Sequence, residues 1–341
     1  MSNLITLTDI HAAKARIAGT TVRTPLVRLS RARLRMAGFA ELAETTPEIY
    51  LKDESAQPIG SFKLRGAYNK IAQLSAEQLQ RGVVTYSSGN HAQGVSYAAR
   101  ARGAKAVIIM PSNAPRLKIE ATAALGAEIV TVGPSSLERK QKAEELEALH
   151  GYTMVPPYDD EAVIAGQATC GLEILEQLPN VGLVLAPVSG GGLLSGVASG
   201  IKLTTGQEIP QVWGCEPELA ADAKESFDTR TLVEWPAAKT TRTLADGLRT
   251  QSLGERNFEH VLHFVDGIVT VTEDEIRAAL RIILSTTSLI AEPSGAVALA
   301  AALFHSHQLP KADKVVAVLS GGNLDPALRA ELESEIAAAH V

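Results

Sequence analysis

The sequence predicts an α/β protein with twisted, parallel-rich sheets that are covered by helices on both faces. Short runs of β-branched residues alternate with longer amphipathic stretches through most of the chain. Some of the apolar runs pass directly into small polar or glycine-rich turns and then into helical patterns. Alternation of this kind is typical of parallel sheets, in which a helix usually connects one strand to the next.

The elements follow in chain order. The predicted strands are short and rich in valine, isoleucine and leucine: 48–52, 83–86, 106–110, 129–132, 183–187, 211–216, 268–271 and 314–319. The predicted helices are longer and amphipathic: 9–18, 90–102, 115–125, 137–150, 193–203, 272–287 and 325–340. Thr272 and Glu275 form a predicted capping box at the start of their helix.

Composition limits the classes of function. At 341 residues, with 45% hydrophobic and 21% charged residues, the chain is long enough for two globular domains. A net charge of -6 without a basic run argues against nucleic acid as a partner. The first residues lack the pattern of a signal peptide, and no apolar run reaches membrane-spanning length. Cys170 and Cys215 form no disulfide framework, which predicts a cytoplasmic protein with buried thiols.

Two loop-like stretches interrupt the pattern, at 156–160 and at 229–249. The first, Pro-Pro-Tyr-Asp-Asp, is the predicted boundary between two lobes. The strands from about 82 to 132 would then belong to a small inserted domain, 53–160. The large domain would consist of 1–52 and 161–341.

The stretch 61–67, Ser-Phe-Lys-Leu-Arg-Gly-Ala, predicts a helix start with Ser61 as the capping residue. Lys63 would lie in the first turn, where the positive end of the helix dipole lowers the pKa of an amine. A lysine that forms a Schiff base requires a lowered pKa. The alternative is an ordinary solvated helix lysine.

The stretch 186–196 runs from an apolar strand through Ser189 and three glycines into a helix. Glycines allow close approach of the backbone, and free amides at a helix start attract an anion, which predicts a phosphate site. The alternative is a tight turn. No lysine follows at the spacing of a Walker A loop. A dinucleotide site stays open, with Glu216 as the ribose-binding acid, although Ser195 stands where the third glycine belongs.

Two further stretches combine strand ends with polar groups. Residues 85–94 offer hydroxyls, the Asn90 amide and free N–H groups, which suit a carboxylate and a ring hydroxyl. The alternative is that Asn90 only caps a helix. Residues 318–323 end a strand in Ser320 and a glycine pair.

Together these stretches resemble the fold-type II pyridoxal-phosphate (PLP) enzymes, a two-domain, tryptophan synthase β-like fold. Within them, the sequence is similar to the threonine/serine ammonia-lyase (dehydratase) and serine racemase family, from Thr24 to Asn323. The resemblance implies that Lys63 binds the cofactor covalently. The other cofactor-binding residues that it implies are Phe62 and Gly247 on the two ring faces, Asn90 at the ring hydroxyl, Ser320 at the pyridine nitrogen, and Ser189, Gly190, Gly191, Gly192 and Leu193 at the phosphate.

The resemblance also implies a substrate site. Ser88 matches the hydroxyl that acts as a second catalytic acid/base in serine racemases, and its alternative role is that of a turn hydroxyl. Arg139 matches a substrate-facing arginine that would pair with the second carboxylate of 3-hydroxyaspartate, although it could be a surface residue of a charged helix. The implied substrate-binding residues are Ser87, Ser88, Asn90, His91 and Arg139.

The stretch 215–222 resembles the divalent-cation site of the racemase branch, with Glu216, the Ala220 carbonyl and Asp222 as ligands of Mg²⁺ or Ca²⁺. The alternative is a solvated acidic turn. By contrast, the stretch 156–160 resembles the ammonia-lyases. The histidines at 260, 263, 305 and 307 lack a third ligand at useful spacing and are predicted to be helix-surface residues.

The predicted activity is therefore PLP-dependent β-elimination of L-serine, L-threonine or 3-hydroxyaspartate to a 2-oxo acid and ammonia, with some serine racemase activity. A neutral hydroxyl at Ser320 makes the ring a weaker electron sink, which favours elimination. The alternatives are a serine racemase, a nicotinamide-dependent dehydrogenase and a non-catalytic two-lobed ligand-binding protein. The resemblance further implies a homodimer.

Overall fold

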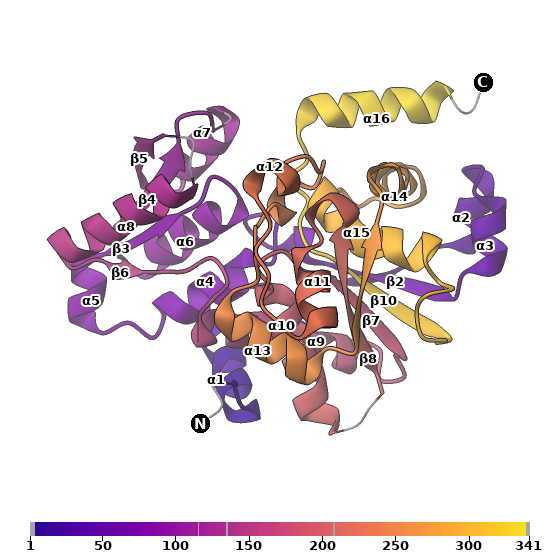
Figure 1. Cartoon of the computed structure of the whole chain (residues 1–341), viewed down its shortest axis with the longest axis horizontal. Helices are drawn as coiled ribbons and strands as arrows, with labels where there is room; N and C mark the ends of the chain where they lie inside the picture. Colours follow the sequence, from indigo (N-terminus) through magenta and orange to yellow (C-terminus); the bar gives the residue numbers. More distant parts are fainter. Residues whose placement is uncertain (1–3, 115, 134–135, 207–208, 339–341) are drawn as a thin grey trace.

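The strands of the protein form two sheets in a computed structural model that describes residues 4–114, 116–133, 136–206 and 209–338 (Figure 1). The six-stranded sheet has the order β1-β2-β10-β7-β8-β9: Leu26–Arg28, Glu48–Asp53, Lys314–Leu319, Leu183–Pro187, Gln211–Pro217 and Gly267–Val271. The four-stranded sheet has the order β5-β4-β3-β6: Glu128–Val132, Ala106–Pro111, Val83–Tyr86 and Thr153–Met154. All neighbouring strands are parallel except β1 and β2. The predicted α/β fold class is confirmed.

Helices surround and connect the strands. In chain order, the α-helices are α1 Leu7–Ile17, α2 Arg31–Met36, α3 Ala40–Thr45, α4 Lys63–Ile71, α5 Ala76–Arg81, α6 Asn90–Ala101, α7 Arg116–Ala124, α8 Ser136–His150, α9 Glu161–Gln177, α10 Gly192–Thr205, α11 Asp222–Thr229, α12 Ala237–Thr240, α13 Glu255–Phe264, α14 Glu273–Thr286, α15 Pro293–Phe304 and α16 Pro326–Ala338. Single 3₁₀ turns are η1 Glu54–Ala56, η2 Glu218–Ala220 and η3 Asp246–Leu248.

Both faces of the six-stranded sheet are buried. Leu183 and Leu185 of β7 belong to the hydrophobic cluster that contains α14 and α15, whereas Val184 and Ala186 belong to the cluster that contains α10. Successive side chains of a strand point to opposite faces, so one β-branched run supplies two cores. This arrangement explains why the predicted strands are apolar throughout rather than alternating.

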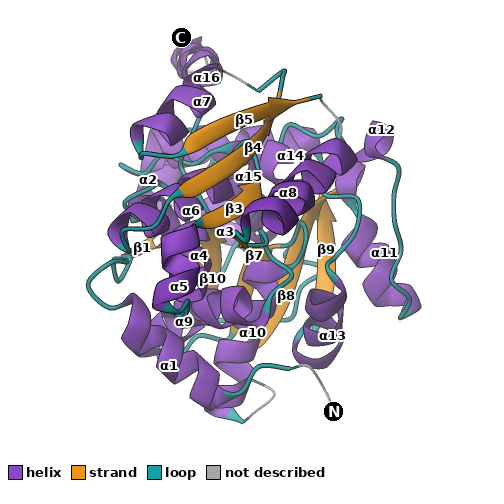
Figure 2. Cartoon of the chain, turned by 90° about the vertical axis from the view of Figure 1, so that its left-hand side faces the viewer, coloured by secondary structure: helices purple, strands orange, loops and turns teal. Residues whose placement is uncertain are grey.

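The four-stranded sheet, with α7 and α8, lies beside the larger sheet (Figures 1 and 2). Helix α4 packs on both α6 and α9, and α9 in turn packs on α10. Helix α4 therefore connects the helices of one sheet to those of the other. The division into domains at residues 53 and 160 stays a prediction.

Each predicted strand is present, and its ends agree with the prediction to within one residue. The capping box of Thr272 and Glu275 is also present. Residues 115, 339 and 340, which were included in predicted helices, lie outside the described residues. The predictions did not include the short strands β1 and β6 or the helices α9, α13 and α15.

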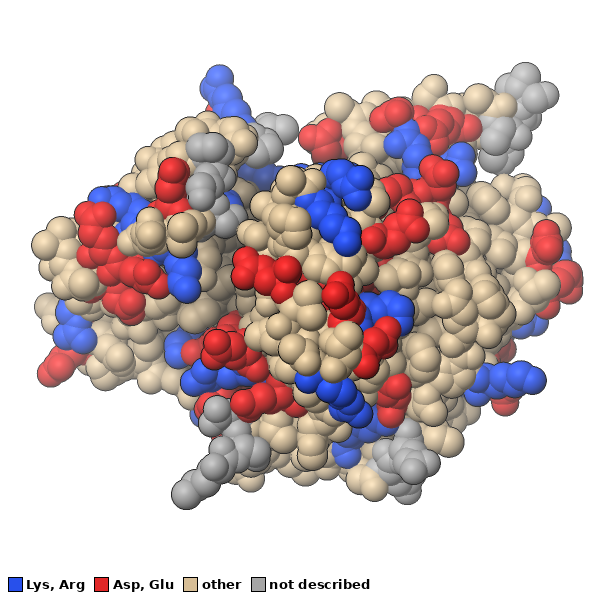
Figure 3. All heavy atoms as spheres, viewed as in Figure 1, with Lys and Arg blue, Asp and Glu red and all other residues tan. Residues whose placement is uncertain are grey.

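Acidic and basic side chains are interspersed on the face shown in Figure 3, without a continuous basic stripe. Within the described part of the chain, no helix has both the length and the apolar character needed to cross a membrane.

Candidate active site

The start of α4 is held by the end of β10 rather than by a side-chain cap. The helix begins at Lys63, and Phe62 precedes it without a capping side chain. The prediction that Ser61 caps the helix is wrong, because its buried hydroxyl has no hydrogen-bond partner. Instead, the Phe62 N–H donates to the Ser320 carbonyl at 3.1 Å, and Ser61 forms a β-bridge with Gly321. The chain therefore fixes Lys63 next to the strand end that carries Ser320.

Lys63 is half-buried. Its Nζ donates to the Pro157 carbonyl at 2.8 Å and lies 5.1 Å from the ring centroid of Phe62. Burial lowers the pKa of the amine from 10.5 to about 8. The predicted direction of the pKa shift agrees, and loss of solvation on burial is its cause.

The glycine-rich loop forms a tight turn between β7 and α10. Ser189 and Gly191 have positive φ angles of 56° and 95°, and α10 begins at Gly192. The Ser189 hydroxyl donates to the Gly247 carbonyl at 3.1 Å. The loop and Gly247, which are distant in sequence, therefore meet at one place.

The segment 156–160 touches several parts of this region. A Cβ atom on Gly190 would lie only 2.5 Å from the Tyr158 ring, so the glycine permits that close packing. The carboxylate of Asp159 accepts from the Arg256 N–H at 2.9 Å, at the start of α13. The sequence predicts only a domain boundary and a family feature at this segment, because these contacts join residues that are distant in the chain.

The start of α15, with the preceding residue Glu292, connects three predicted cofactor-binding residues. The Asn90 amide donates to the Glu292 carboxylate at 2.6 Å. The Gly247 N–H donates to the Ser294 hydroxyl at 2.9 Å, and the Ser320 hydroxyl donates to the Ser294 carbonyl at 3.4 Å. Sequence reasoning missed Glu292 and Ser294. A polar pair at the start of an otherwise apolar helical run was the signal that could have found them.

The predicted substrate residues lie at the end of β3 and the start of α6. The Ser87 hydroxyl accepts from the Gly89 N–H at 3.3 Å, and Ser88 is half-buried. His91 is buried, and its Nε2–H donates to the Val155 carbonyl at 2.9 Å. Burial, assisted by the nearby Lys63, lowers the pKa of His91 to about 3, so His91 is neutral near pH 7.

Arg139 lies apart from this turn, on α8, which packs against β3. It is half-buried, and burial lowers the pKa of its guanidinium. The ionised form of Tyr86, the last residue of β3, raises this pKa.

The predicted cation ligands Glu216 and Asp222 are both buried, at 1% exposure each. The Glu216 carboxylate accepts from the Lys224 N–H at 2.8 Å, but its other oxygen and one oxygen of Asp222 lack hydrogen-bond partners. Burial, followed by the charge of Asp222, raises the pKa of Glu216. Burial also raises the pKa of Asp222 to about 7. A solvated acidic turn would have exposed carboxylates, so that alternative is wrong.

Ala220, the third predicted ligand, is buried in η2 between the two carboxylates in sequence. Within the described residues, no group of three or more His, Cys, Asp or Glu side chains could hold a metal ion. The predicted site contains only two such side chains and a backbone carbonyl.

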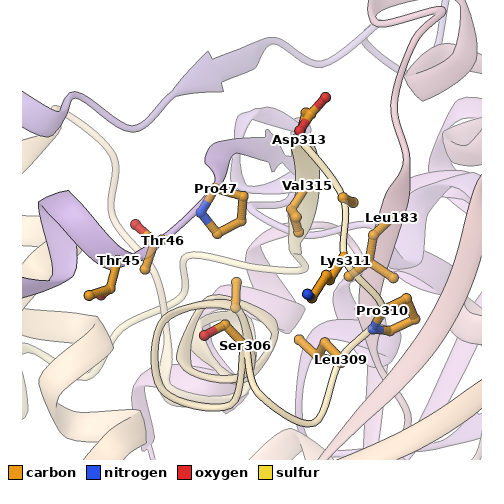
Figure 4. A pocket seen from close by; sticks show the side chains of 12 residues that line it. Thr45, Thr46, Pro47, Leu183, Ser306, Leu309, Pro310, Lys311, Asp313 and Val315 are labelled. Carbon is orange, nitrogen blue, oxygen red and sulfur yellow. The ribbon is translucent and has the colours of Figure 1, made fainter.

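A separate cavity of about 490 Å³ lies at the opposite end of the large sheet (Figure 4). It is lined by Leu183 and Val315, near the amino ends of β7 and β10, together with Pro47 and Lys311. The glycine loop and Ser320 follow the carboxyl ends of these same strands. The cavity is therefore distinct from the candidate active site.

The histidine predictions were partly wrong. His260 is completely buried. Its Nε2 accepts from the Ile5 N–H at 3.1 Å, and its Nδ1–H donates to the Arg256 carbonyl at 2.7 Å. His305 lies 2.9 Å from the Glu275 carboxylate. His260 therefore has a structural role that attaches the N-terminal segment to α13.

Comparisons with known proteins agree with this geometry. A family model described as "Pyridoxal-phosphate dependent enzyme" matches residues 17–321. The catabolic L-threonine dehydratase of Staphylococcus aureus (strain USA300) is 38% identical over 326 residues, which cover 95% of this chain and 90% of that protein.

Solved structures show the same likeness. A threonine deaminase of T.th. is 42% identical, with a TM-score of 0.85, and the match covers 94% of this chain and 99% of that one. Maize serine racemase is 34% identical, with a TM-score of 0.87, and the match covers 98% of this chain and 99% of that one.

Proposed function

The chain belongs to the family of pyridoxal-phosphate-dependent enzymes, and from this premise we propose that Lys63 holds the cofactor for β-elimination from a β-hydroxy amino acid. The enzyme is a PLP-dependent ammonia-lyase of the threonine dehydratase type. The strongest support for the assignment of Lys63 is the burial of its side chain, which lowers the pKa of the amine to about 8. The amine lies 2.8 Å from the Pro157 carbonyl, in the segment that packs on the glycine loop. The substrates proposed are L-serine, L-threonine and 3-hydroxyaspartate.

The residues around Lys63 fit pyridoxal phosphate. The first-turn amides of α10 have no partners within the helix, and they follow Ser189 and the glycines that would bind the phosphate. Asn90 supplies a donor for the ring hydroxyl, and Ser320 supplies a neutral hydroxyl for the pyridine nitrogen. Phe62 and Gly247 would flank the ring. When bound, the cofactor supplies an electron sink that acidifies the Cα–H bond of the amino acid.

The side chains and backbone amides of the protein then transfer protons and position the substrate. A neutral Lys63 amine takes the proton from Cα, because a fraction of this amine is unprotonated at neutral pH. The substrate carboxylate binds the N–H groups at the start of α6, near Ser87 and Ser88. Loss of the β-hydroxyl and hydrolysis then yield the 2-oxo acid and ammonia. Arg139 is proposed to accept a second carboxylate, which would extend the substrates to 3-hydroxyaspartate.

Serine racemisation is the second proposed activity, because it needs an acid/base group on the ring face opposite Lys63 and Ser88 occupies the turn before α6. A serine hydroxyl is a weak base near neutral pH, so elimination is expected to dominate.

Incubation of the holoenzyme with L-serine in D₂O tests both activities. Pyruvate, D-serine and deuterium at Cα are followed together, and L-threonine and 3-hydroxyaspartate are compared by kcat/KM. Ser88→Ala is expected to lower D-serine formation at least tenfold more than pyruvate formation. Ser75→Ala, which removes an exposed hydroxyl that caps α5, is the matched control. Absence of 2-oxo acid from all three substrates would contradict the elimination activity, and steady pyruvate release without D-serine would contradict the racemase activity.

We also propose that Glu216, the Ala220 carbonyl and Asp222 bind Mg²⁺ or Ca²⁺. The support is the pair of buried carboxylate oxygens without hydrogen-bond partners, because a buried charge requires compensation. Oxygen ligands completed by water are the ligands that these cations prefer.

Cation binding should stabilise the protein more at high pH than at low pH. The folded-state pKa of Asp222, about 7, lies above its usual value of 3.8, so without a cation the stability from this group is lost as the pH rises through 7. We expect Mg²⁺ to raise the melting temperature of EDTA-treated protein at pH 8.5 and to have little effect at pH 6. Asp222→Asn should abolish the response, whereas Asp228→Asn in the same helix should retain it. Equal responses in the two variants would rule out this site.

The family resemblance leads us to expect a homodimer, and the two buried free thiols are consistent with a reducing cytoplasm.

A further inference from the structure

Three polar side chains form a chain of hydrogen bonds that ends at Glu292. The Asn323 Nδ2 group donates to the Ile59 carbonyl at 3.1 Å and to Asn90 Oδ1 at 2.7 Å. The Asn90 Nδ2 group then donates to the Glu292 carboxylate at 2.6 Å. This chain joins the segment before α4, the start of α6, the start of α15 and the loop after β10.

The donors and acceptors in this chain fix the orientation of both amides. The Ile59 carbonyl can only accept, so Asn323 must direct its NH₂ group to that side. Both hydrogens of this group are then used, and Asn90 must direct its oxygen toward Asn323. The NH₂ group of Asn90 consequently faces Glu292 and donates one hydrogen there. Hydrogen bonds among the described residues leave its second hydrogen available.

We propose that Asn323 and Glu292 are positioning residues that make Asn90 offer an N–H donor, rather than its oxygen, to the ring hydroxyl oxygen of the cofactor. The inference rests on the proposed function, in which Asn90 binds that oxygen. The two ends of an asparagine amide have nearly the same shape, so packing alone does not select between them. A donor at this position stabilises the ionised ring oxygen, whereas an acceptor would require a protonated one.

Glu292 also makes this contact sensitive to pH. It is 6% exposed and directly precedes α15. Burial and the charge of Asp246 raise its pKa to about 7, while the Asn90 hydrogen bond and Lys118 act in the opposite direction. Asp246 and Lys118 are the charged groups that influence Glu292, and they form an ion pair with each other at 2.6 Å. As the pH rises through neutrality, the Glu292 carboxyl group therefore gains a negative charge next to the Asn90 amide.

Asn323→Asp is the first test, because it replaces the NH₂ group with an oxygen of similar size. That oxygen would face the Ile59 carbonyl and Asn90 Oδ1, so the Asn90 amide would lose its fixed orientation. We expect the dissociation constant for pyridoxal phosphate, measured by absorbance titration, to rise at least tenfold. Asn180→Asp, which adds the same charge at an exposed position, should leave the constant unchanged.

Glu292→Gln is the second test, because it keeps an oxygen acceptor for Asn90 but removes the charge. The visible spectrum of the wild-type holoenzyme should change between pH 6 and 8, and the variant should lose this transition while its dissociation constant stays within about threefold. The exposed Glu77→Gln should keep the transition.

A wild-type dissociation constant in Asn323→Asp, or a wild-type spectral transition in Glu292→Gln, would overturn the inference. Asn90→Ala separates the inference from its premise. If this variant binds the cofactor as well as wild type does, the proposed role of Asn90 is wrong. If Asn90→Ala weakens binding and Asn323→Asp does not, only the positioning role fails.

Discussion

Replacement of Lys63 by alanine is expected to lower turnover of the β-hydroxy amino acid at least about 1,000-fold, because it removes both the group that holds the cofactor and the base. Burial lowers the pKa of the amine to about 8. At pH 7 about 10% of such an amine is neutral, compared with about 0.03% of an amine with the ordinary value. The burial of Lys63 therefore increases the fraction of neutral amine a few hundredfold.

Two measurements check this expectation. Borohydride reduction of the holoenzyme, followed by peptide mass spectrometry, should find the cofactor on the peptide that contains Lys63. Lys70→Ala is the matched control, because Lys70 lies in the same helix and its amine pairs with Asp160 at 2.6 Å. This control should keep most of the wild-type turnover. A Lys63→Ala protein with more than about 1% of wild-type turnover would contradict the assignment.

Local pattern was sufficient to predict every described strand except the short β1 and β6, because each of the predicted strands is a short β-branched run between polar turns. The same reasoning missed α9 and α15 for a physical reason. Residues 163–174 of α9 and 293–303 of α15 are buried throughout. A helix that is surrounded by protein has no polar face, so the period of 3.6 residues is absent from its sequence.

In the candidate site, too, some residues could be predicted from local sequence motifs and others could not. Lys63, the glycine loop and Ser320 follow from motifs at strand ends and helix starts. The contacts of Pro157 with Lys63, and of Glu292 with Asn90, join residues 94 and 202 positions apart. Single-sequence patterns carry no information at such separations, so these partners required the folded structure.

The largest effect on stability is expected at Arg65, two residues after Lys63. Its guanidinium is completely buried, and it forms ion pairs with Glu54 and Glu173 at 2.8 Å each. Lys52, also completely buried, pairs with Glu173 at 2.6 Å. These four charges connect η1, β2, α4 and α9. The cluster therefore attaches the helix that carries Lys63 to the rest of the protein.

Arg65→Met should lower the free energy of unfolding by about 3–5 kcal/mol, because it leaves two buried carboxylates with only Lys52 as counterion. Arg329→Met, at an exposed i,i+4 pair with Glu333, should cost about 0.5 kcal/mol or less. The double variant Arg65→Met/Glu54→Gln should regain part of the loss, since removal of both partners leaves fewer unpaired charges. Urea unfolding at pH 7 measures all three.

The pH dependence distinguishes loss of charge compensation from simple loss of packing. In the wild type, Arg65 opposes the effect of burial and lowers the pKa of Glu54 to about 2, below its usual 4.5. A lowered pKa in a folded acid contributes stability that is present above 4.5 and is lost as the pH falls toward 2. Without Arg65, burial should raise the pKa of Glu54 instead, so the variant should regain stability relative to wild type as the pH falls from 7 to 5. A destabilisation that is the same at pH 7 and pH 5 would mean that Arg65 acts through packing, and the electrostatic account of the cluster would then be wrong.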